Sequence, residues 1–201
     1  IDLANDILGY DIKKIMFSGP IDILTKTIHT QPAIFIASYI VGSILVQNGL
    51  NPKSIAGHSV GEVTAYTLAK SLSFEDGLKF VQFRATAMHE AGLAESGSMA
   101  AVIGIDEKIL EDICINYTNG IVCVANYNSP NQSVISGDSN AIEDISPKIL
   151  EAGAIKVIKL NVSGAFHSPL MKTAHDKLSE FVQGTKFGDA IFPVYSNTSA
   201  S

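Results

Sequence analysis

The stretch Gly57-His58-Ser59-Val60-Gly61 decides how this chain is interpreted. It has the form G-x-S-x-G, which in many α/β enzymes is a sharp turn between a buried strand and a helix. A short, partly β-branched run precedes it at residues 54–56, as at the end of a buried strand, and a helix-forming run follows it at residues 62–69. Such a turn would expose the Ser59 hydroxyl above a sheet as a nucleophile. The backbone N–H of Val60 would then point at a developing oxyanion.

The two glycines of this turn have a steric interpretation. A side chain at Gly57 or at Gly61 would crowd the backbone around a strained nucleophile. A simpler interpretation also fits, in which Ser59 only caps a helix after a glycine turn. The five residues alone leave both interpretations open, because G-x-S-x-G also occurs in ordinary loops.

Composition restricts the class of protein. The chain has 201 residues, of which 46% are hydrophobic and 17% charged, so we expect a globular protein with a sizeable core. The net charge is −6 and the basic residues are scattered, which argues against a nucleic-acid partner. Cys114 and Cys123 are expected to be free thiols, and no cluster of residues has the spacing of metal ligands. The longest apolar run, residues 33–46, contains serine and glycine and predicts a buried core helix rather than a membrane span.

The pattern of apolar residues changes along the chain. Long helices are predicted at residues 31–47, with Pro32 in the first turn, and at 74–91, with a break near Gly77. Further on, the expected order is strand, helix, strand, strand, helix, strand, which is the ferredoxin-like arrangement. These elements are expected at residues 99–104, 107–117, 121–126, 133–136, 141–152 and 154–160, with a turn at 128–131.

Six segments then follow one another along the chain: 30–34 (TQPAI), 57–62 (GHSVGE), 83–90 (FRATAMHE), 97–104 (GSMAAVIG), 126–132 (NYNSPNQ) and 164–171 (GAFHSPLM). In this order they resemble the malonyl-CoA:acyl-carrier-protein transacylases and the acyltransferase domains of polyketide synthases. The resemblance implies an α/β fold with a hydrolase-like parallel-sheet core, residues 1–96 and 163–201. It also implies an inserted ferredoxin-like subdomain, residues 97–162, with the active site in the cleft between the two parts.

A serine nucleophile needs a base within hydrogen-bond reach. His167 is the best candidate, because it follows a predicted strand end and a turn of small residues, and the resemblance assigns it this role. His58 adjoins Ser59, but neighbouring side chains on a sharp turn point apart. The other histidines fall on helix-like stretches: His29, His89 and His175. No sequence feature identifies a triad acid.

Arg84 is the predicted partner of a substrate carboxylate, since guanidinium is always charged and binds carboxylates in a bidentate manner. The alternative is a surface arginine on an amphipathic helix. The resemblance also implies an acyl pocket in which the bulk of Phe166 favours malonyl over branched acyl groups. Met88, Asn128 and Gln31 are further candidates for substrate binding. Alternatively, Met88 is a core methionine and Asn128 is an ordinary turn residue. Gln31 is either a helix-start residue or a group near the G-x-S-x-G turn.

The resemblance therefore implies transfer of a malonyl group from malonyl-CoA to the phosphopantetheine thiol of acyl carrier protein, through a malonyl-serine ester, in fatty acid or polyketide synthesis. The alternatives are a serine hydrolase or thioesterase, a polyketide synthase module using another extender unit, and a non-catalytic scaffold that docks carrier protein. We expect no cofactor or metal, no nucleic-acid or membrane partner, and a monomer in the cytoplasm or an organelle such as a plastid or mitochondrion.

Compared with the family, both ends of the chain are expected to be incomplete. The family has an earlier strand ending in a G-Q-G loop, whose glutamine lies near the oxyanion. It also has later C-terminal segments, one of which orients the histidine through a backbone carbonyl. We therefore expect a second oxyanion donor and the group that orients His167 to lie outside residues 1–201.

Overall fold

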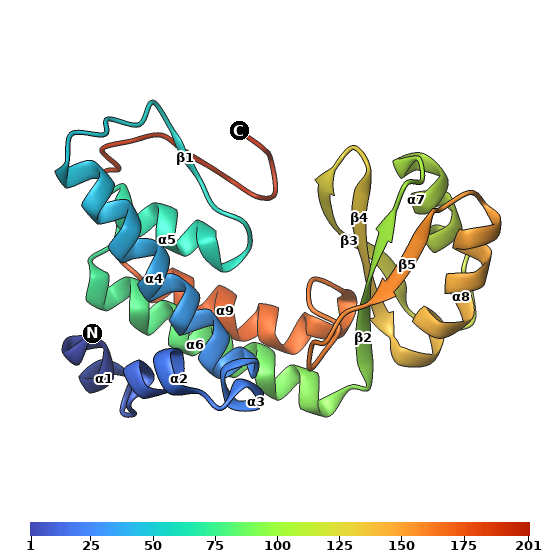
Figure 1. Ribbon diagram of the computed structural model, residues 1–201, viewed down its shortest axis with the longest axis horizontal. Helices are drawn as coiled ribbons and strands as arrows, with labels where there is room; N and C mark the ends of the chain where they lie inside the picture. The colour runs from blue at the N-terminus through green and yellow to red at the C-terminus, as the bar shows by residue number, and fades with distance from the viewer. The chain divides into compact units, whose positions relative to one another are not determined.

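The computed structural model describes residues 1–201 and divides them into two compact units (Figure 1). Unit 1 comprises Ile1–Thr86 and Glu180–Ser201, and unit 2 comprises Ala87–Ser179. Helices α6 (Phe74–Ala94) and α9 (Lys172–Gly184) supply residues to both units. The predicted division into a core of residues 1–96 and 163–201 and a subdomain of residues 97–162 stays a prediction.

Unit 1 combines helices with a short parallel sheet. Strand β1 (Ile55–Ala56) pairs in parallel with β6 (Val194–Tyr195), with Ile55 opposite Val194. Its helices, besides parts of α6 and α9, are α1 (Asp2–Leu8), α2 (Ile12–Ser18), α3 (Ile21–Leu24), α4 (Thr27–Gln47) and α5 (Val60–Leu68). A strand, a turn and a helix follow one another here, as the G-x-S-x-G stretch predicted, but the strand end is not buried: Ile55 is half-buried and Ala56 is exposed.

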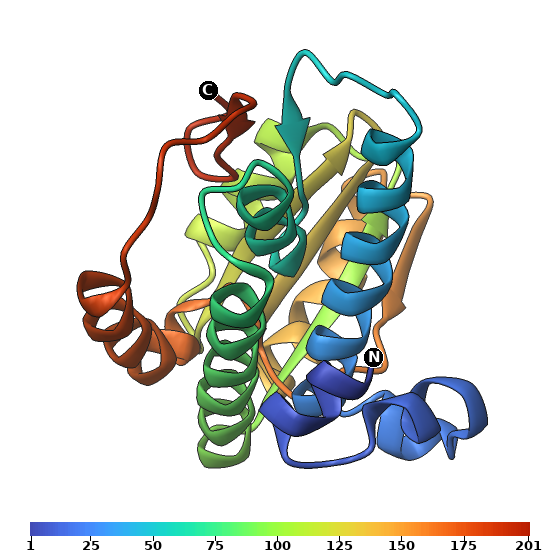
Figure 2. The ribbon, with the colours of Figure 1, turned by 90° about the vertical axis from the view of Figure 1, so that its left-hand side faces the viewer.

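The core of unit 1 lies where α4, α5 and α6 meet. Helices α4 and α6 run side by side there, with α5 next to them (Figure 2). The ring of Phe35 on α4 is fully buried and stacks on Phe74 with ring centroids 5.7 Å apart. Other buried members of this core are Ile36, Val60, Val63, Leu78 and Val81. This packing fixes the helix that begins directly after Ser59.

Two predictions about the long helices are wrong. Helix α4 begins at Thr27, so Pro32 lies inside it rather than in its first turn. Proline has no N–H for the Ile28 carbonyl four residues earlier, and the Tyr10 hydroxyl donates to that carbonyl instead, at 3.2 Å. Helix α6 does not break near Gly77. A Cβ there would lie 2.4 Å from Thr67 Oγ1 and 2.9 Å from Phe35 Cζ, so this glycine permits close packing between helices.

Helix α4 was expected to be buried throughout, but only its first half is. Its buried residues end at Ile36, whereas Ile40, Val41, Ile44 and Leu45 are exposed. Its neighbours α2, α3 and α5 leave this outer side of the second half uncovered. By length and composition α4 could cross a membrane, a test that core helices of soluble proteins also pass.

Unit 2 contains a four-stranded antiparallel sheet in the order β3-β4-β2-β5. The strands are β2 (Gly97–Ile103), β3 (Val122–Ser129), β4 (Gln132–Asp138) and β5 (Lys156–Lys159). Helices α7 (Glu107–Ile115) and α8 (Ser139–Glu151) cover one face of the sheet, and the buried core lies between them and the strands (Figure 1). This is the predicted ferredoxin-like arrangement.

The hairpin between β3 and β4 is tighter than predicted. Strand β3 continues to Ser129 and β4 begins at Gln132, so Asn128 lies on a strand and not in the turn. Register shifts within β3, between Val124 and Asn126 and between Tyr127 and Ser129, let the strand continue through this polar segment.

Candidate active site

Ser59 lies on a strained turn between β1 and α5. Its backbone has φ 54° and ψ −111°, a conformation that a non-glycine residue adopts only when its surroundings hold it there. A Cβ at Gly57 would lie 1.9 Å from the Gly61 carbonyl oxygen, so the turn requires glycine at this position. At Gly61 a Cβ would meet no atom within 4 Å. The prediction that both glycines are sterically required is therefore wrong for Gly61, which faces open space.

The backbone N–H of Val60 is the first of helix α5. N–H groups in the first turn of a helix have no acceptor inside the helix, and this end carries partial positive charge. The next two N–H groups are already used, because Gly61 donates to the His58 carbonyl at 2.9 Å and Glu62 to the Ser59 carbonyl at 3.1 Å. Val60 therefore offers a donor directly after the nucleophile, where an oxyanion can accept it.

Arg84 of α6 reaches the serine directly. Its Nη2 donates a hydrogen bond to Ser59 Oγ at 2.9 Å, and its Nη1 donates to Gln31 Oε1. Gln31 is buried on α4, and its Nε2 donates to Thr27 Oγ1 at 2.8 Å. Thr27 thus orients the Gln31 amide so that its oxygen faces the guanidinium. Three of the predicted site residues, Gln31, Ser59 and Arg84, form one connected group.

The guanidinium of Arg84 is a partly buried positive charge. Burial lowers the pKa of Arg84 to about 10, against the opposing effect of nearby Glu62, so the group is charged at neutral pH. The two side-chain acceptors that hold it, from Gln31 and Ser59, are neutral. A partly desolvated charge is costly until an opposite charge pairs with it. The arrangement therefore favours an anionic group next to the serine.

Sequence reasoning missed Asn197, which follows β6. Its Oδ1 accepts the Ser59 backbone N–H at 2.8 Å, and its Nδ2 donates to the Gly57 carbonyl at 2.6 Å. The parallel pairing of β1 with β6 brings it beside the turn, although it lies 138 residues after Ser59. The only signal in the sequence is an asparagine two residues after a short apolar run, which is too common to interpret.

The remaining predicted residues belong to unit 2. His167 lies in the turn before a 3-10 helix (Pro169–Met171) and has φ 61°. Ser59 and His167 are two of the four non-glycine residues with positive φ. Ser168 Oγ donates to the Ala165 carbonyl at 2.6 Å, and Cys123 Sγ lies 3.8 Å from the His167 carbonyl oxygen. The histidine turn is therefore held in a strained conformation, as is common at functional sites.

Phe166 and Met88 share one apolar cluster of unit 2. Phe166 is half-buried there, and Met88 is 7% exposed, packed with Met171. Burial of Met88 agrees with its alternative interpretation as a core methionine, and its place in an acyl pocket stays a prediction. Asn128 is exposed on β3 and is not part of this cluster.

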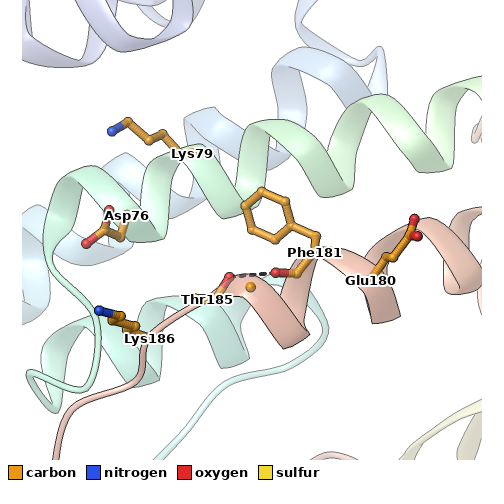
Figure 3. Close-up of a pocket in the computed structure, with 7 residues that line it drawn as sticks. Asp76, Lys79, Glu180, Phe181, Thr185 and Lys186 are labelled. Atoms are coloured by element: carbon orange, nitrogen blue, oxygen red, sulfur yellow. Dashed lines mark hydrogen bonds between the residues drawn. The ribbon is translucent and has the colours of Figure 1, made fainter.

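A hollow of about 590 Å³ on unit 1 is lined by none of these residues. Figure 3 shows the residues that line it, which come from α6 and from the end of α9 and the segment after it, and which include Asp76, Lys79, Glu180 and Lys186. Its positive and negative side chains are equal in number, and the Thr185 hydroxyl donates a hydrogen bond to the Phe181 carbonyl at 2.9 Å. The reactive groups of unit 1 therefore gather at the turn around Ser59 rather than in this hollow.

The chain is similar to a set of known proteins. The family described as "Acyl transferase domain" matches residues 3–201. The chain is 39% identical over 201 residues to the malonyl CoA-acyl carrier protein transacylase of Bacillus subtilis (strain 168), covering 99% of this chain and 63% of that protein. It is 38% identical over 199 residues to the protein of that name from Staphylococcus aureus (strain MRSA252), covering 98% and 64%. The chain therefore spans less than two thirds of these relatives.

Solved structures are similar over nearly the whole chain. One is a type II PKS acyl-carrier protein in complex with its malonyl-transacylase, with a TM-score of 0.94 and 36% identity over 98% of this chain and 65% of that one. Another is an acyl-carrier-protein S-malonyltransferase from Burkholderia pseudomallei, with a TM-score of 0.93 and 38% identity over 100% of this chain and 66% of that one.

Proposed function

Since the chain belongs to the acyl transferase domain family, as its six motifs predicted, we propose that it transfers a malonyl group from malonyl-CoA to the phosphopantetheine thiol of an acyl carrier protein. The names of its relatives support this reaction. One observation carries the proposal: the Arg84 guanidinium donates to Ser59 Oγ at 2.9 Å. A fixed cation directly beside the nucleophile suits an acyl group that carries a free carboxylate.

In the first half-reaction, Ser59 Oγ attacks the thioester carbonyl carbon of malonyl-CoA while His167 takes the hydroxyl proton. The Val60 N–H binds the oxyanion that forms. The carbon–sulfur bond then breaks, and the proton on His167 goes to the CoA sulfur. In the second half-reaction, the phosphopantetheine thiol gives its proton to His167 and attacks the malonyl-serine ester. The ester bond between the malonyl carbonyl carbon and Ser59 Oγ then breaks, and Ser59 Oγ takes the proton from His167.

The substrate carboxylate pairs with Arg84 throughout this cycle. The malonyl carboxylate takes up the position beside the guanidinium, while Gln31 continues to hold Nη1. Because Gln31 is neutral, it orients the guanidinium without competing for its charge. Acyl groups without a carboxylate would leave the partly buried charge unpaired and are disfavoured.

Mass spectrometry on the wild-type protein tests the reaction class. Incubation with malonyl-CoA is expected to give a malonyl adduct that persists in buffer and disappears when holo acyl carrier protein is added, with the malonyl group recovered on the carrier. A hydrolase or thioesterase would lose the adduct at the same rate without any thiol. A non-catalytic docking scaffold would form no adduct. Either of these outcomes would contradict the proposal.

The setting of the reaction is also part of the proposal. The curated relatives are bacterial proteins, and we propose a cytoplasmic enzyme that supplies malonyl units for fatty acid synthesis. Acyl carrier protein is the proposed partner, and one similar solved structure is a complex of a malonyl-transacylase with its carrier protein.

Replacing Gln31 by glutamate tests the orienting role of this amide. In Gln31→Glu the introduced carboxylate would form an ion pair with the Arg84 guanidinium. The malonyl carboxylate would then compete with it for the same positive charge. The expected result is at least a tenfold loss of malonyl transfer relative to acetyl transfer, since a charge-assisted pair is worth about 1.5–3 kcal/mol. Gln47→Glu adds the same charge at an exposed position of α4 and serves as the control. An equal ratio in both variants would contradict the role of Gln31.

Replacing Phe166 by serine tests which acyl groups fit. We propose that the ring lies next to C2 of the acyl group, where malonyl carries only hydrogens and methylmalonyl carries a methyl. One methyl in a tight pocket is worth about 1–3 kcal/mol, so Phe166→Ser should admit methylmalonyl-CoA and also lose some malonyl activity. Competition between the two CoA esters, read as acyl-enzyme masses, measures this. Phe17→Ser, at an aromatic residue 72% exposed, is the control. An unchanged preference would show that Phe166 faces away from the acyl group.

A further inference from the structure

The Asn197 side chain contacts the turn at the two peptide groups that lead into Ser59. Its side-chain oxygen accepts the Ser59 N–H at 2.8 Å, and its side-chain nitrogen donates to the Gly57 carbonyl at 2.6 Å. Its backbone N–H also donates to Glu62 Oε1 at 3.4 Å. An amide offers an acceptor and a donor at once, whereas a carboxylate only accepts. The two side-chain bonds therefore use both ends of this amide.

These contacts act on the strained part of the backbone. Ser59 has φ 54° and ψ −111°, which costs free energy unless neighbouring groups over-determine the conformation. The bonds to Gly57 and Ser59 hold the two peptide groups through which the chain enters this residue. The direction of Ser59 Oγ and that of the Val60 N–H both follow from this backbone geometry.

We propose that Asn197 is a positioning residue for acyl transfer. It holds the turn so that Ser59 Oγ and the Val60 N–H already point in the directions that the reaction needs before substrate binds. Asn197 touches the backbone of the turn and not the reacting atoms. For its substrate this inference rests on the proposed function, whereas for the reactivity of Ser59 it stands on the geometry of unit 1 alone. Asn197 thereby becomes the one residue after β6 that we assign to positioning Ser59.

Asn197→Ala tests this with two reagents that acylate or phosphonylate serine. The first is malonyl-CoA, which uses Arg84. The second is a small neutral alkyl fluorophosphonate, whose phosphorus bonds to Ser59 Oγ while fluoride leaves and the base takes the proton, with no carboxylate for Arg84 to bind. Both rate constants are expected to fall on the order of 10- to 100-fold, as for a misplaced reacting group. The malonyl-CoA concentration at half-maximal rate should change less than about twofold, because Gln31 and Arg84 are untouched.

Ser199→Ala is the matched control, since Ser199 is exposed and its side chain bonds only with Ser201. It is expected to keep wild-type rates with both reagents. Rates are compared per folded molecule, with the folded fraction taken from circular dichroism melts. Normalisation keeps a loss of folding from being read as a loss of positioning.

Three outcomes would overturn the inference. They are wild-type rates in Asn197→Ala, a loss that vanishes after normalisation to folded protein, and a rise in half-saturating malonyl-CoA with an unchanged rate constant. Failure of the proposed function looks different. The wild-type protein would then react with the fluorophosphonate but form no malonyl adduct. The rate constants of Asn197→Ala and wild type with the fluorophosphonate could still be compared, so the role of Asn197 would still be tested.

Discussion

Ser59→Ala is expected to abolish formation of the malonyl adduct, with the transfer rate falling by at least about 10⁴-fold, the scale on which enzymes lose activity when a serine nucleophile is removed. The reason is that Ser59 is the hydroxyl on the strained turn, beside both the Val60 N–H and the Arg84 guanidinium. Intact-protein mass spectrometry after incubation with malonyl-CoA measures the adduct directly.

The control for this variant is Ser54→Ala, at an exposed serine just before β1. It should be acylated like the wild-type protein. An adduct that persists on Ser59→Ala would assign the nucleophile to another residue, and peptide mapping of that adduct would locate it.

Arg84→Ala is expected to remove the preference for acyl groups that carry a carboxylate. Loss of a charge-assisted carboxylate pair costs about 1.5–3 kcal/mol, so the ratio of malonyl to acetyl transfer should fall on the order of 10- to 150-fold. The ratio is the informative quantity, because Arg84 also donates to Ser59 Oγ and its loss can change the rate with both substrates. Competition between malonyl-CoA and acetyl-CoA, read as acyl-enzyme masses, gives this ratio.

Two further variants make the Arg84 result specific. Arg84→Lys keeps a positive charge but cannot bond to Gln31 and a carboxylate at once in the planar geometry of guanidinium, so it should recover only part of the preference. Lys79→Ala removes an exposed positive charge from the same helix and should leave the ratio unchanged. A malonyl-to-acetyl ratio within about twofold of wild type in Arg84→Ala would show that Arg84 does not select acyl groups that carry a carboxylate.

The same contacts show that the cost of burying the Arg84 charge is borne by the protein before any substrate binds. Arg84 is partly buried beside neutral partners, and burial lowers its pKa to about 10. The desolvation cost is therefore already present in the free protein, and a carboxylate that binds recovers part of it. A lysine at this position would be neutralised more readily by the same burial.

Much of the local structure followed from the sequence. G-x-S-x-G predicted a strand, a sharp turn and a helix, because a glycine at position 57 permits the close backbone approach that such a turn needs. The periodicity of residues 98–160 predicted the order of the ferredoxin-like strands and helices. These inferences succeed because they depend on neighbours within a few residues along the chain. The start of α4 was misjudged because a distant group, the Tyr10 hydroxyl, takes the place of the N–H that Pro32 lacks.

By itself the sequence determined where the G-x-S-x-G turn lies and to which family the chain belongs, and it predicted the residue types of the site. All of these depend on short motifs of neighbouring residues. Only the tertiary structure decided which of them meet. Packing of α4 against α6 brings Arg84 within hydrogen-bond distance of Gln31 and of Ser59. The parallel pairing of β1 with β6 places Asn197 on the turn across 138 residues. Helix crossing and strand pairing depend on how whole surfaces fit together, and no local pattern encodes that fit.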